Sequence, residues 1–164
     1  MAFDYLRGVR SLIPLWAILA GCGSEVHQPV GYNHDVHVNK LQIGCDNCHA
    51  GSMTGQVAGL PTVSDCADCH AEANGTSDEE KKVVEAVKAN RPLVWQRLYS
   101  IPSHVFFTHR RHVQSGGIAC ERCHGLMKNQ KRPPPAPLVA LTMTDCINCH
   151  RERGVSTDCT TCHR

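Results

Sequence analysis

Ten of the eleven cysteines in this chain belong to five copies of one pentapeptide, Cys-x-x-Cys-His. Two thiols three residues apart can bond covalently to one porphyrin, and the histidine that follows can bind its iron, as in c-type haem attachment. Histidine is 11 of 164 residues, so five such histidines would arise by chance with a probability on the order of one in a million. The copies are Cys45-Cys48-His49, Cys66-Cys69-His70, Cys120-Cys123-His124, Cys146-Cys149-His150 and Cys159-Cys162-His163.

Other uses of paired cysteines explain this pattern less well. Five disulfides in a small exported protein would account for the even number of cysteines but not for the five histidines. A protein with several zinc ions is the stronger alternative, because zinc binds both residue types. We predict five covalently attached haems c. The ten motif cysteines would hold them, and the motif histidines His49, His70, His124, His150 and His163 would bind their irons.

The first 22 residues predict export. Two arginines precede an apolar stretch from Leu12 to Ala20, which is too short to span a bilayer and has the proportions of a signal-peptide core. The sequence Leu-Ala-Gly-Cys that follows resembles a bacterial lipoprotein box ending at Cys22, the one cysteine outside the motifs. We expect lipidation of Cys22 and an exported, membrane-anchored protein facing the periplasm. An ordinary signal peptide with an incidental thiol is the alternative.

The composition leaves little material for an apolar core. The chain from Cys22 onward provides about 29 residues for each haem, too few for a conventional core around each cofactor. Few large aliphatic residues would otherwise suggest disorder, but haems supply large apolar surfaces of their own. We predict a mostly α and irregular fold, with short helices and loops wrapped around a chain of five haems. Without haem the chain should be largely unfolded.

The charge gives no reason to expect a nucleic-acid partner. The formal net charge is +2, and removal of residues 1–21 leaves +1. The propionates of the haems would make the loaded protein acidic, so no basic surface for nucleic acid is indicated.

An internal repeat supplies further histidines. The segment containing His34 and His37, upstream of Cys45, recurs 75 residues later around His109 and His112. Histidines at positions i and i+3 occupy neighbouring places on one helical face, so each pair can reach two different irons. We therefore predict that these four histidines are the distal ligands of four haems. The repeat extends to the next motif, and the extra residues of the second copy include the proline-rich spacer 133–137.

The fifth haem needs a distal ligand from outside these pairs. His104 and His27 remain, and we prefer His104 because His27 lies only five residues from the expected lipid anchor. The methionines Met53, Met127 and Met143 are alternatives, although methionine more often fills a core than binds iron. Histidine on both sides of every iron predicts lower potentials than methionine ligation would.

The segment between the two repeats predicts a helix. It begins with the pattern of a capping box at Ser77–Glu80, and it should end near Asn90, before Pro92. In the apolar stretch that follows, Trp95 is expected to pack against a haem. We divide the chain into a lipoprotein signal peptide (1–21), a tether (22–30), a first dihaem module (31–76), a helical linker (77–103) and a trihaem module (104–164).

The His-x-x-His pairs upstream of the haem motifs resemble those of class III multihaem cytochromes c. The segment from Trp95 to His109, together with the motif at Cys120, is similar to the pentahaem cytochrome c subunit of alternative complex III. That bacterial membrane complex oxidises menaquinol and passes electrons to periplasmic carriers. The resemblance covers roughly residues 31–164. It implies quinol-oxidising membrane subunits and periplasmic cytochromes as partners. The family subunit is usually anchored by a transmembrane helix, whereas this chain has only the short apolar segment and Cys22, so attachment through lipid is the expectation here.

Three functions are compatible with these features. The chain could be a subunit of a quinol:acceptor oxidoreductase or a free-standing periplasmic lipoprotein that carries electrons. A multihaem reductase is the third, but it would need an iron with an open position. Six histidines outside the motifs can fill five distal positions, so the sequence does not require an open position. We therefore expect an electron-transfer protein with no substrate site of its own.

Overall fold

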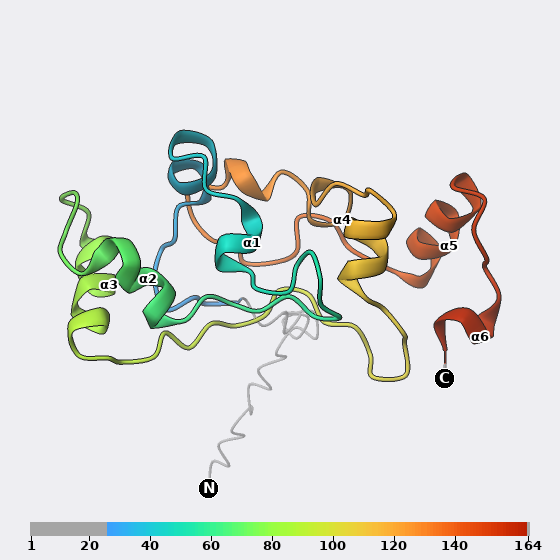
Figure 1. Cartoon of the computed structure of the whole chain (residues 1–164), viewed down its shortest axis with the longest axis horizontal. Helices are drawn as coiled ribbons and strands as arrows, with labels where there is room; N and C mark the ends of the chain where they lie inside the picture. The colour runs from blue at the N-terminus through green and yellow to red at the C-terminus, as the bar shows by residue number, and fades with distance from the viewer. Residues whose placement is uncertain (1–25, 164) are drawn as a thin grey trace, which may run out of the picture.

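The computed structural model describes residues 26–163, which form an elongated arrangement of short helices and loops (Figure 1). The predicted signal peptide, Cys22 and the start of the tether lie outside the described residues. No β-strand occurs in the described part, where an isolated β-bridge joins Val105 and His163, so the predicted mostly α and irregular fold is confirmed. The elements are η1 (Asp35–Lys40), α1 (Cys45–Cys48), α2 (Val63–His70), α3 (Asp78–Lys88), η2 (Arg110–Ser115), α4 (Glu121–His124), η3 (Met127–Asn129), α5 (Met143–Glu152) and α6 (Cys159–Cys162).

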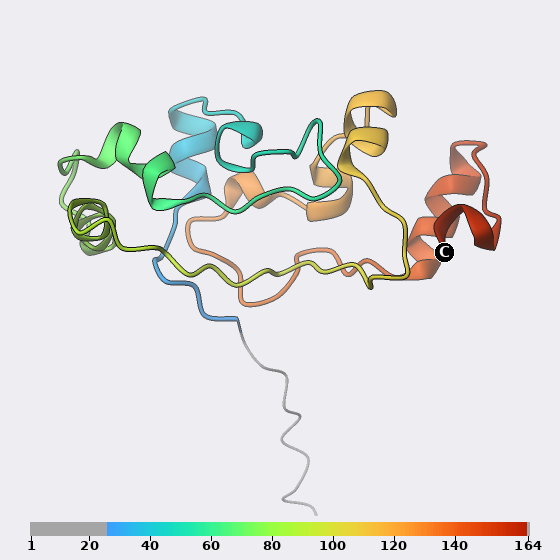
Figure 2. The same cartoon turned by 60° about the horizontal axis from the view of Figure 1, so that its bottom comes forward.

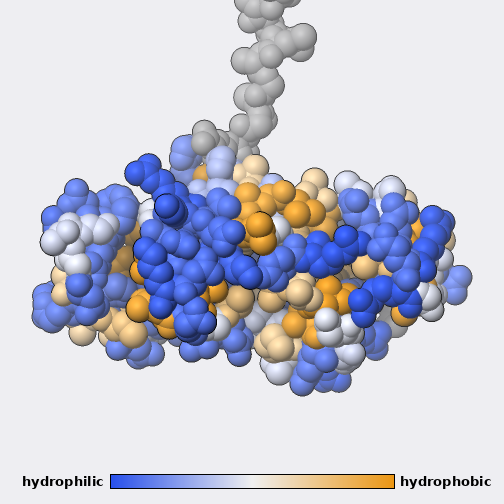
Figure 3. Space-filling view, turned by 90° about the horizontal axis from the view of Figure 1, so that it is seen from above, coloured by the Kyte–Doolittle hydropathy of each residue, from blue (hydrophilic) through white to orange (hydrophobic). Residues whose placement is uncertain are grey.

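Within residues 26–163 there is almost no apolar protein core. The buried hydrophobic residues of this part are Val30, Val84 and Ala86, and many larger ones remain exposed, up to 78% for Val94. Figure 3 shows apolar side chains at the surface between polar ones. Packing of protein side chains alone therefore does not explain how these helices are held in place. No helix among the described residues has the length and apolarity needed to cross a bilayer.

The two segments with paired histidines form π-helical turns. In η1 the backbone N–H of Leu41 donates to the carbonyl of Val36, five residues earlier, at 3.0 Å. The corresponding segment of the second repeat, η2, has the same form. Single π-helical turns are rare and frequently occur at functional sites. The spacing of the histidines predicted a helix, but it did not distinguish this wider turn from an α-helix.

Helices α2 and α5, which carry the second and fourth motifs, begin with the same capping box. In α5 the Thr142 backbone N–H donates to the Asp145 carboxylate at 2.8 Å, and the Asp145 N–H donates to the Thr142 hydroxyl at 3.4 Å. Thr62 and Asp65 make the same reciprocal bonds in α2. These bonds satisfy N–H groups that the first helical turn leaves unpaired. They therefore fix where each motif-bearing helix starts.

Replacing Thr142 with alanine is expected to destabilise the folded protein by about 1 kcal/mol, the usual cost of losing a threonine N-cap. Denaturant unfolding of the purified protein measures this loss. Thr144→Ala is the matched control, because Thr144 is exposed in the same helix, two positions beyond the cap. Equal losses in the two variants would mean that the cap does not stabilise α5.

Helix α3 matches the predicted linker helix but does not begin as expected. It ends at Lys88, followed by Asn90 in the left-handed region with φ of 47°. The predicted capping box is wrong, because the Ser77 side chain makes no capping hydrogen bond. The carboxylate of Glu80, which would have completed the box, instead accepts the backbone N–H of Asn74 at 2.7 Å.

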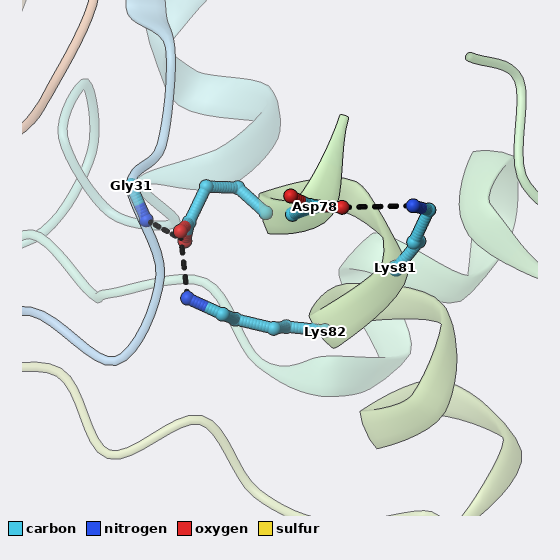
Figure 4. Close-up of polar contacts among 5 residues, drawn as sticks. Gly31, Asp78, Lys81 and Lys82 are labelled. Atoms are coloured by element: carbon cyan, nitrogen blue, oxygen red, sulfur yellow. Dashed lines mark hydrogen bonds and ion pairs between the residues drawn. The ribbon is translucent and has the colours of Figure 1, made fainter. Parts of the chain in front are cut away.

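The first turn of α3 also anchors the beginning of the described chain. The Glu79 carboxylate accepts the backbone N–H of Gly31 at 2.6 Å and an N–H of the Lys82 ammonium at 2.6 Å. Figure 4 shows Gly31 and Lys82 converging in this contact, with the Asp78–Lys81 pair beside it. The hydrogen bond from Lys82 and then that from Gly31 lower the pKa of Glu79. Residues 31 and 79 are thus held together across most of the first repeat.

Candidate haem-binding site

The five motifs lie in a row along the molecule, but not in sequence order. In Figures 1 and 2 the helices that carry them follow one another along the long axis as α2, α1, α4, α5 and α6. These helices hold the second, first, third, fourth and fifth motifs. The chain therefore places its second motif at one end of the row and its fifth motif at the other.

Electrostatic interactions between cysteines of different motifs give the same order. The Cys45 thiol is hydrogen-bonded to that of Cys120, and burial together with this neighbour raises the pKa of Cys45. Burial and the nearby Cys48 likewise raise the pKa of Cys66. Further pairs join the third motif to the fourth, through Cys123 and Cys149, and the fourth to the fifth, through Cys146 and Cys162.

The motif cysteines are available for covalent attachment. All ten are free of disulfide bonds and at least partly exposed. Among residues 26–163, no three or more His, Cys, Asp or Glu side chains gather into a cluster that could hold a metal ion. The histidines come together in twos instead.

Three motif histidines each face a histidine from the repeated segments. Two imidazoles bound to opposite sides of one metal ion, by bonds of about 2 Å, have ring centres roughly 6 Å apart. The observed separations have this size. The ring centres are 6.1 Å apart for His37 and His70, 6.4 Å for His109 and His124, and 6.2 Å for His112 and His150.

His34 lies beside the remaining motif histidine of the first repeat. Burial, and then the nearby His49, lower the pKa of His34 to about 4. The Nδ1 atom of His34 is buried without a hydrogen-bond partner in the structure. An imidazole that is half-buried and held neutral is in the protonation state that binds a metal ion.

The fifth motif is brought together with His104. The rings of His104 and His163 are nearly parallel, with an angle of 18° between their planes and 5.5 Å between their centres. The β-bridge between Val105 and His163 holds the two segments side by side. His27, the other candidate from the sequence, is exposed near the start of the described residues. Of the methionine alternatives, Met143 is 65% exposed.

Hydrogen bonds to the second ring nitrogen orient several of these imidazoles. Nδ1 of His37 lies 2.9 Å from the carbonyl oxygen of Asn33, and Nδ1 of His112 lies 2.9 Å from that of Thr108. A carbonyl can only accept, so Nδ1 carries the proton and Nε2 keeps a free lone pair for a metal. The same holds for His49 with Gly59 (3.0 Å), His109 with Gln56 (3.1 Å) and His150 with Ser156 (2.7 Å). The residues present therefore fit iron ligation through Nε2.

An aromatic ring packs between the two histidines of each repeated segment. Tyr32 stacks on His37 at 4.5 Å and presents its edge to His34 at 4.7 Å. Phe107 contacts His112 and His109 in the same two ways, at 4.5 Å and 5.0 Å. The aromatic positions were visible in the sequence repeat, but their role in setting the two ring orientations was not. Stacked and edge-on contacts of this kind hold rings at fixed angles.

Trp95 lies next to this arrangement. Its indole N–H donates to the carbonyl of Pro61 at 2.8 Å, and its ring meets the edge of Tyr32 at 6.4 Å. With Leu93 and Val94 it lines an open, largely apolar hollow at the start of α2. The predicted contact between Trp95 and a haem stays a prediction.

The environment of His70 could not be read from the sequence. Its Nδ1 lies 3.2 Å from the carboxylate of Glu80. The ring N–H is not aimed closely enough at this oxygen to form a directed hydrogen bond, so the contact is mainly electrostatic. The sequence placed Glu80 in a helix cap, because the position fits that pattern and nothing local indicates a histidine ten residues away.

Paired imidazoles beside free Cys-x-x-Cys motifs, repeated along an elongated chain without an apolar core, define a multihaem c-type cytochrome. Comparison with models of protein families agrees. Residues 19–97 match the class III cytochrome c family, and residues 105–164 match cytochrome c7 and related cytochromes c. The two matches together cover most of the chain and identify it as a multihaem cytochrome c of the class III and c7 families. The resemblance inferred from the sequence is confirmed, and covalently bound c-type haem is the cofactor of these families.

A curated relative gives a more specific comparison. The chain is 36% identical over 110 residues to the menaquinone reductase, multihaem cytochrome c subunit of Nitratidesulfovibrio vulgaris Hildenborough. The alignment covers 66% of this chain and 51% of the relative. The chain thus spans about half the length of the curated relative it matches.

Proposed function

We propose that this chain carries electrons through five covalently bound haems c, as a membrane-anchored subunit of a quinol:acceptor oxidoreductase. The observation that carries this proposal is the set of facing histidine rings, with four centre separations between 5.5 and 6.4 Å. When bound, each haem supplies one-electron chemistry at its iron. The chain attaches the haems through its motif cysteines and closes both faces of each iron with imidazole.

The ring pairs support one assignment of the distal ligands. In this assignment the second, third, fourth and fifth motifs receive His37, His109, His112 and His104, whose rings face the motif histidines. The first motif receives His34, which lies half-buried near His49. In His37, His109 and His112 the hydrogen bonds at Nδ1 fix the tautomer and keep Nε2 directed away from the backbone.

Closed iron sites favour electron transfer over catalysis at a haem. A reductase would leave one iron without a protein ligand on one side, so that substrate could bind there. Every motif histidine instead has a partner imidazole nearby, which supports a subunit or carrier with no substrate site of its own. The catalytic alternative would require one of these pairs to open.

The relative's name supports a quinone-linked partner. It describes a subunit of a menaquinone reductase, and the segment from Trp95 to His109 resembles the corresponding subunit of alternative complex III. Export and lipidation at Cys22 would put the chain on the periplasmic face of a membrane, where it could meet both a quinol-oxidising complex and periplasmic cytochromes. A free-standing lipoprotein carrier differs only in lacking the complex.

Three kinds of measurement test the proposal. Mass spectrometry of the mature exported protein should show the added mass of five haems and, at its first residue, of lipid on Cys22. Optical and electron paramagnetic resonance (EPR) spectra should show low-spin haem alone. No tetrapyrrole mass, or zinc in its place, would overturn the haem assignment, and a high-spin component in the intact protein would support the reductase instead. Copurification with quinol-oxidising membrane subunits would separate a complex subunit from a free carrier.

Replacing His37 with alanine is expected to convert one haem, that of the second motif, from low spin to high spin. The variant loses the imidazole that faces His70 at 6.1 Å, so that iron gains an open position. EPR spectroscopy and carbon monoxide binding measure the change. Lys40→Ala is the control, because Lys40 is exposed at the end of the same π-helical turn. Unchanged low-spin content in His37→Ala would contradict the assignment of this ligand.

A further inference from the structure

One proposed iron ligand has a carboxylate beside its outer nitrogen. Nδ1 of His70 lies 3.2 Å from Glu80, and the two side chains are 22% and 13% exposed. In residues 26–163 no other histidine has a ring nitrogen within 4.0 Å of a carboxylate oxygen. His49 and His150, the motif histidines with an assigned Nδ1 partner, face neutral backbone carbonyls instead.

The position of the Glu80 carboxylate is fixed by the backbone. It accepts the N–H of Asn74 at 2.7 Å, and a further backbone hydrogen bond comes from Gly75. The loop between α2 and α3 therefore holds this carboxylate against the last residue of α2. Glu80 therefore makes this contact and takes no part in a capping box, and Ser77 makes no capping hydrogen bond either.

We propose that Glu80 is a positioning residue that makes the His70 site the lowest in reduction potential of the five. This inference rests on the proposed function, since it requires a haem at the second motif. A negative charge next to Nδ1 makes the imidazole more basic and favours the oxidised, more positive state of the iron it binds. The effect is strong because both groups are largely shielded from water.

The location of this site gives the effect a consequence. Helix α2 lies at one end of the row of motif-bearing helices (Figures 1 and 2). A low potential at an end of the row favours electrons moving away from that end toward the others. The α2 end would then face the donor, and the α6 end would face the acceptor.

The test is a potentiometric titration of the haem-loaded protein and its Glu80→Gln variant. Glutamine keeps an oxygen that can accept the Asn74 N–H but removes the charge. The equilibrium constant of one of the five one-electron reductions should change about tenfold in favour of the reduced state. This corresponds to a rise of ~59 mV in its reduction potential. The other four steps should stay in place, and the EPR signal of one low-spin site should change. Glu79→Gln is the matched control, because it removes a neighbouring charge that contacts Gly31 and Lys82 instead.

Several outcomes would overturn the inference. They are an unshifted titration in Glu80→Gln, an equal shift in Glu79→Gln, or a shift spread evenly over all five steps. If Glu80→Gln loses a haem, Glu80→Asp keeps the charge and decides the question. Its lowest step should stay near that of the unmodified protein, and a full tenfold shift there would count against a charge effect. Absence of haem from the unmodified protein would refute the proposed function itself.

Discussion

A chain that carries no haem is expected to lose nearly all of its helical structure. Among the described residues the buried hydrophobic side chains are Val30, Val84 and Ala86, and burying such a side chain contributes at most about 3 kcal/mol. Ordering the backbone costs roughly 1–2 kcal/mol for every residue. Three small buried side chains cannot offset that cost over the described chain. The covalently bound haems must supply the missing apolar surface, so attachment and folding should be one process.

Replacement of all ten motif cysteines with alanine tests this expectation, because it prevents covalent attachment. Far-ultraviolet circular dichroism should show an unfolded chain, and a protease should digest it quickly. The haem-loaded protein in the same buffer is the control. Cooperative unfolding of a helical, haem-free variant would show that the polypeptide has a stable core of its own.

Removal of the His104 imidazole is expected to leave the iron at the fifth motif with an open coordination position. Removal of the His27 imidazole should leave every iron with both of its imidazole ligands. Both histidines were candidates from the sequence, and the structure distinguishes them. The His104 ring is stacked 5.5 Å from His163, whereas His27 is exposed. An iron that loses one of two imidazoles becomes high-spin and can bind an external ligand.

EPR and optical spectra of His104→Ala and His27→Ala make this comparison directly. We expect about one fifth of the haem to become high-spin in His104→Ala and none in His27→Ala, since one of five sites is affected. Added imidazole should restore the low-spin spectrum of His104→Ala, which separates a lost ligand from a misfolded chain. The reverse pattern would assign the fifth distal position to His27.

The sequence predicted the parts of the site that depend on spacing. The five motifs were visible because attachment needs fixed spacing, and the repeat around His34 and His109 was visible because both copies retain it. The linker helix was predicted from its apolar positions and its stop before Pro92, and it ends at Lys88. These features are local, so a short stretch of sequence contains the physical cause of each.

Features that depend on contacts between distant segments were not predicted. The Ser77 capping box was wrong because the same Glu80 side chain has a competing site at His70, which only the folded chain provides. The order of the motifs along the molecule depends on contacts such as that of Cys45 with Cys120. The carbonyl groups that orient His49, His109 and His150 also come from loops whose sequence has no characteristic pattern. The boundaries of the proposed modules stay predictions.

One hydrogen bond described above bears on how such a chain could have evolved. His109 in the second copy of the repeat is oriented by the carbonyl of Gln56, which belongs to the first copy, and the next backbone N–H, that of Arg110, donates to Gly55. A gene fragment encoding the second copy alone would yield an incomplete product, because it would lack the group that aims one of its imidazoles. The second copy of the repeat therefore depends on the first. Cutting the gene between them should therefore not recover two working cytochromes.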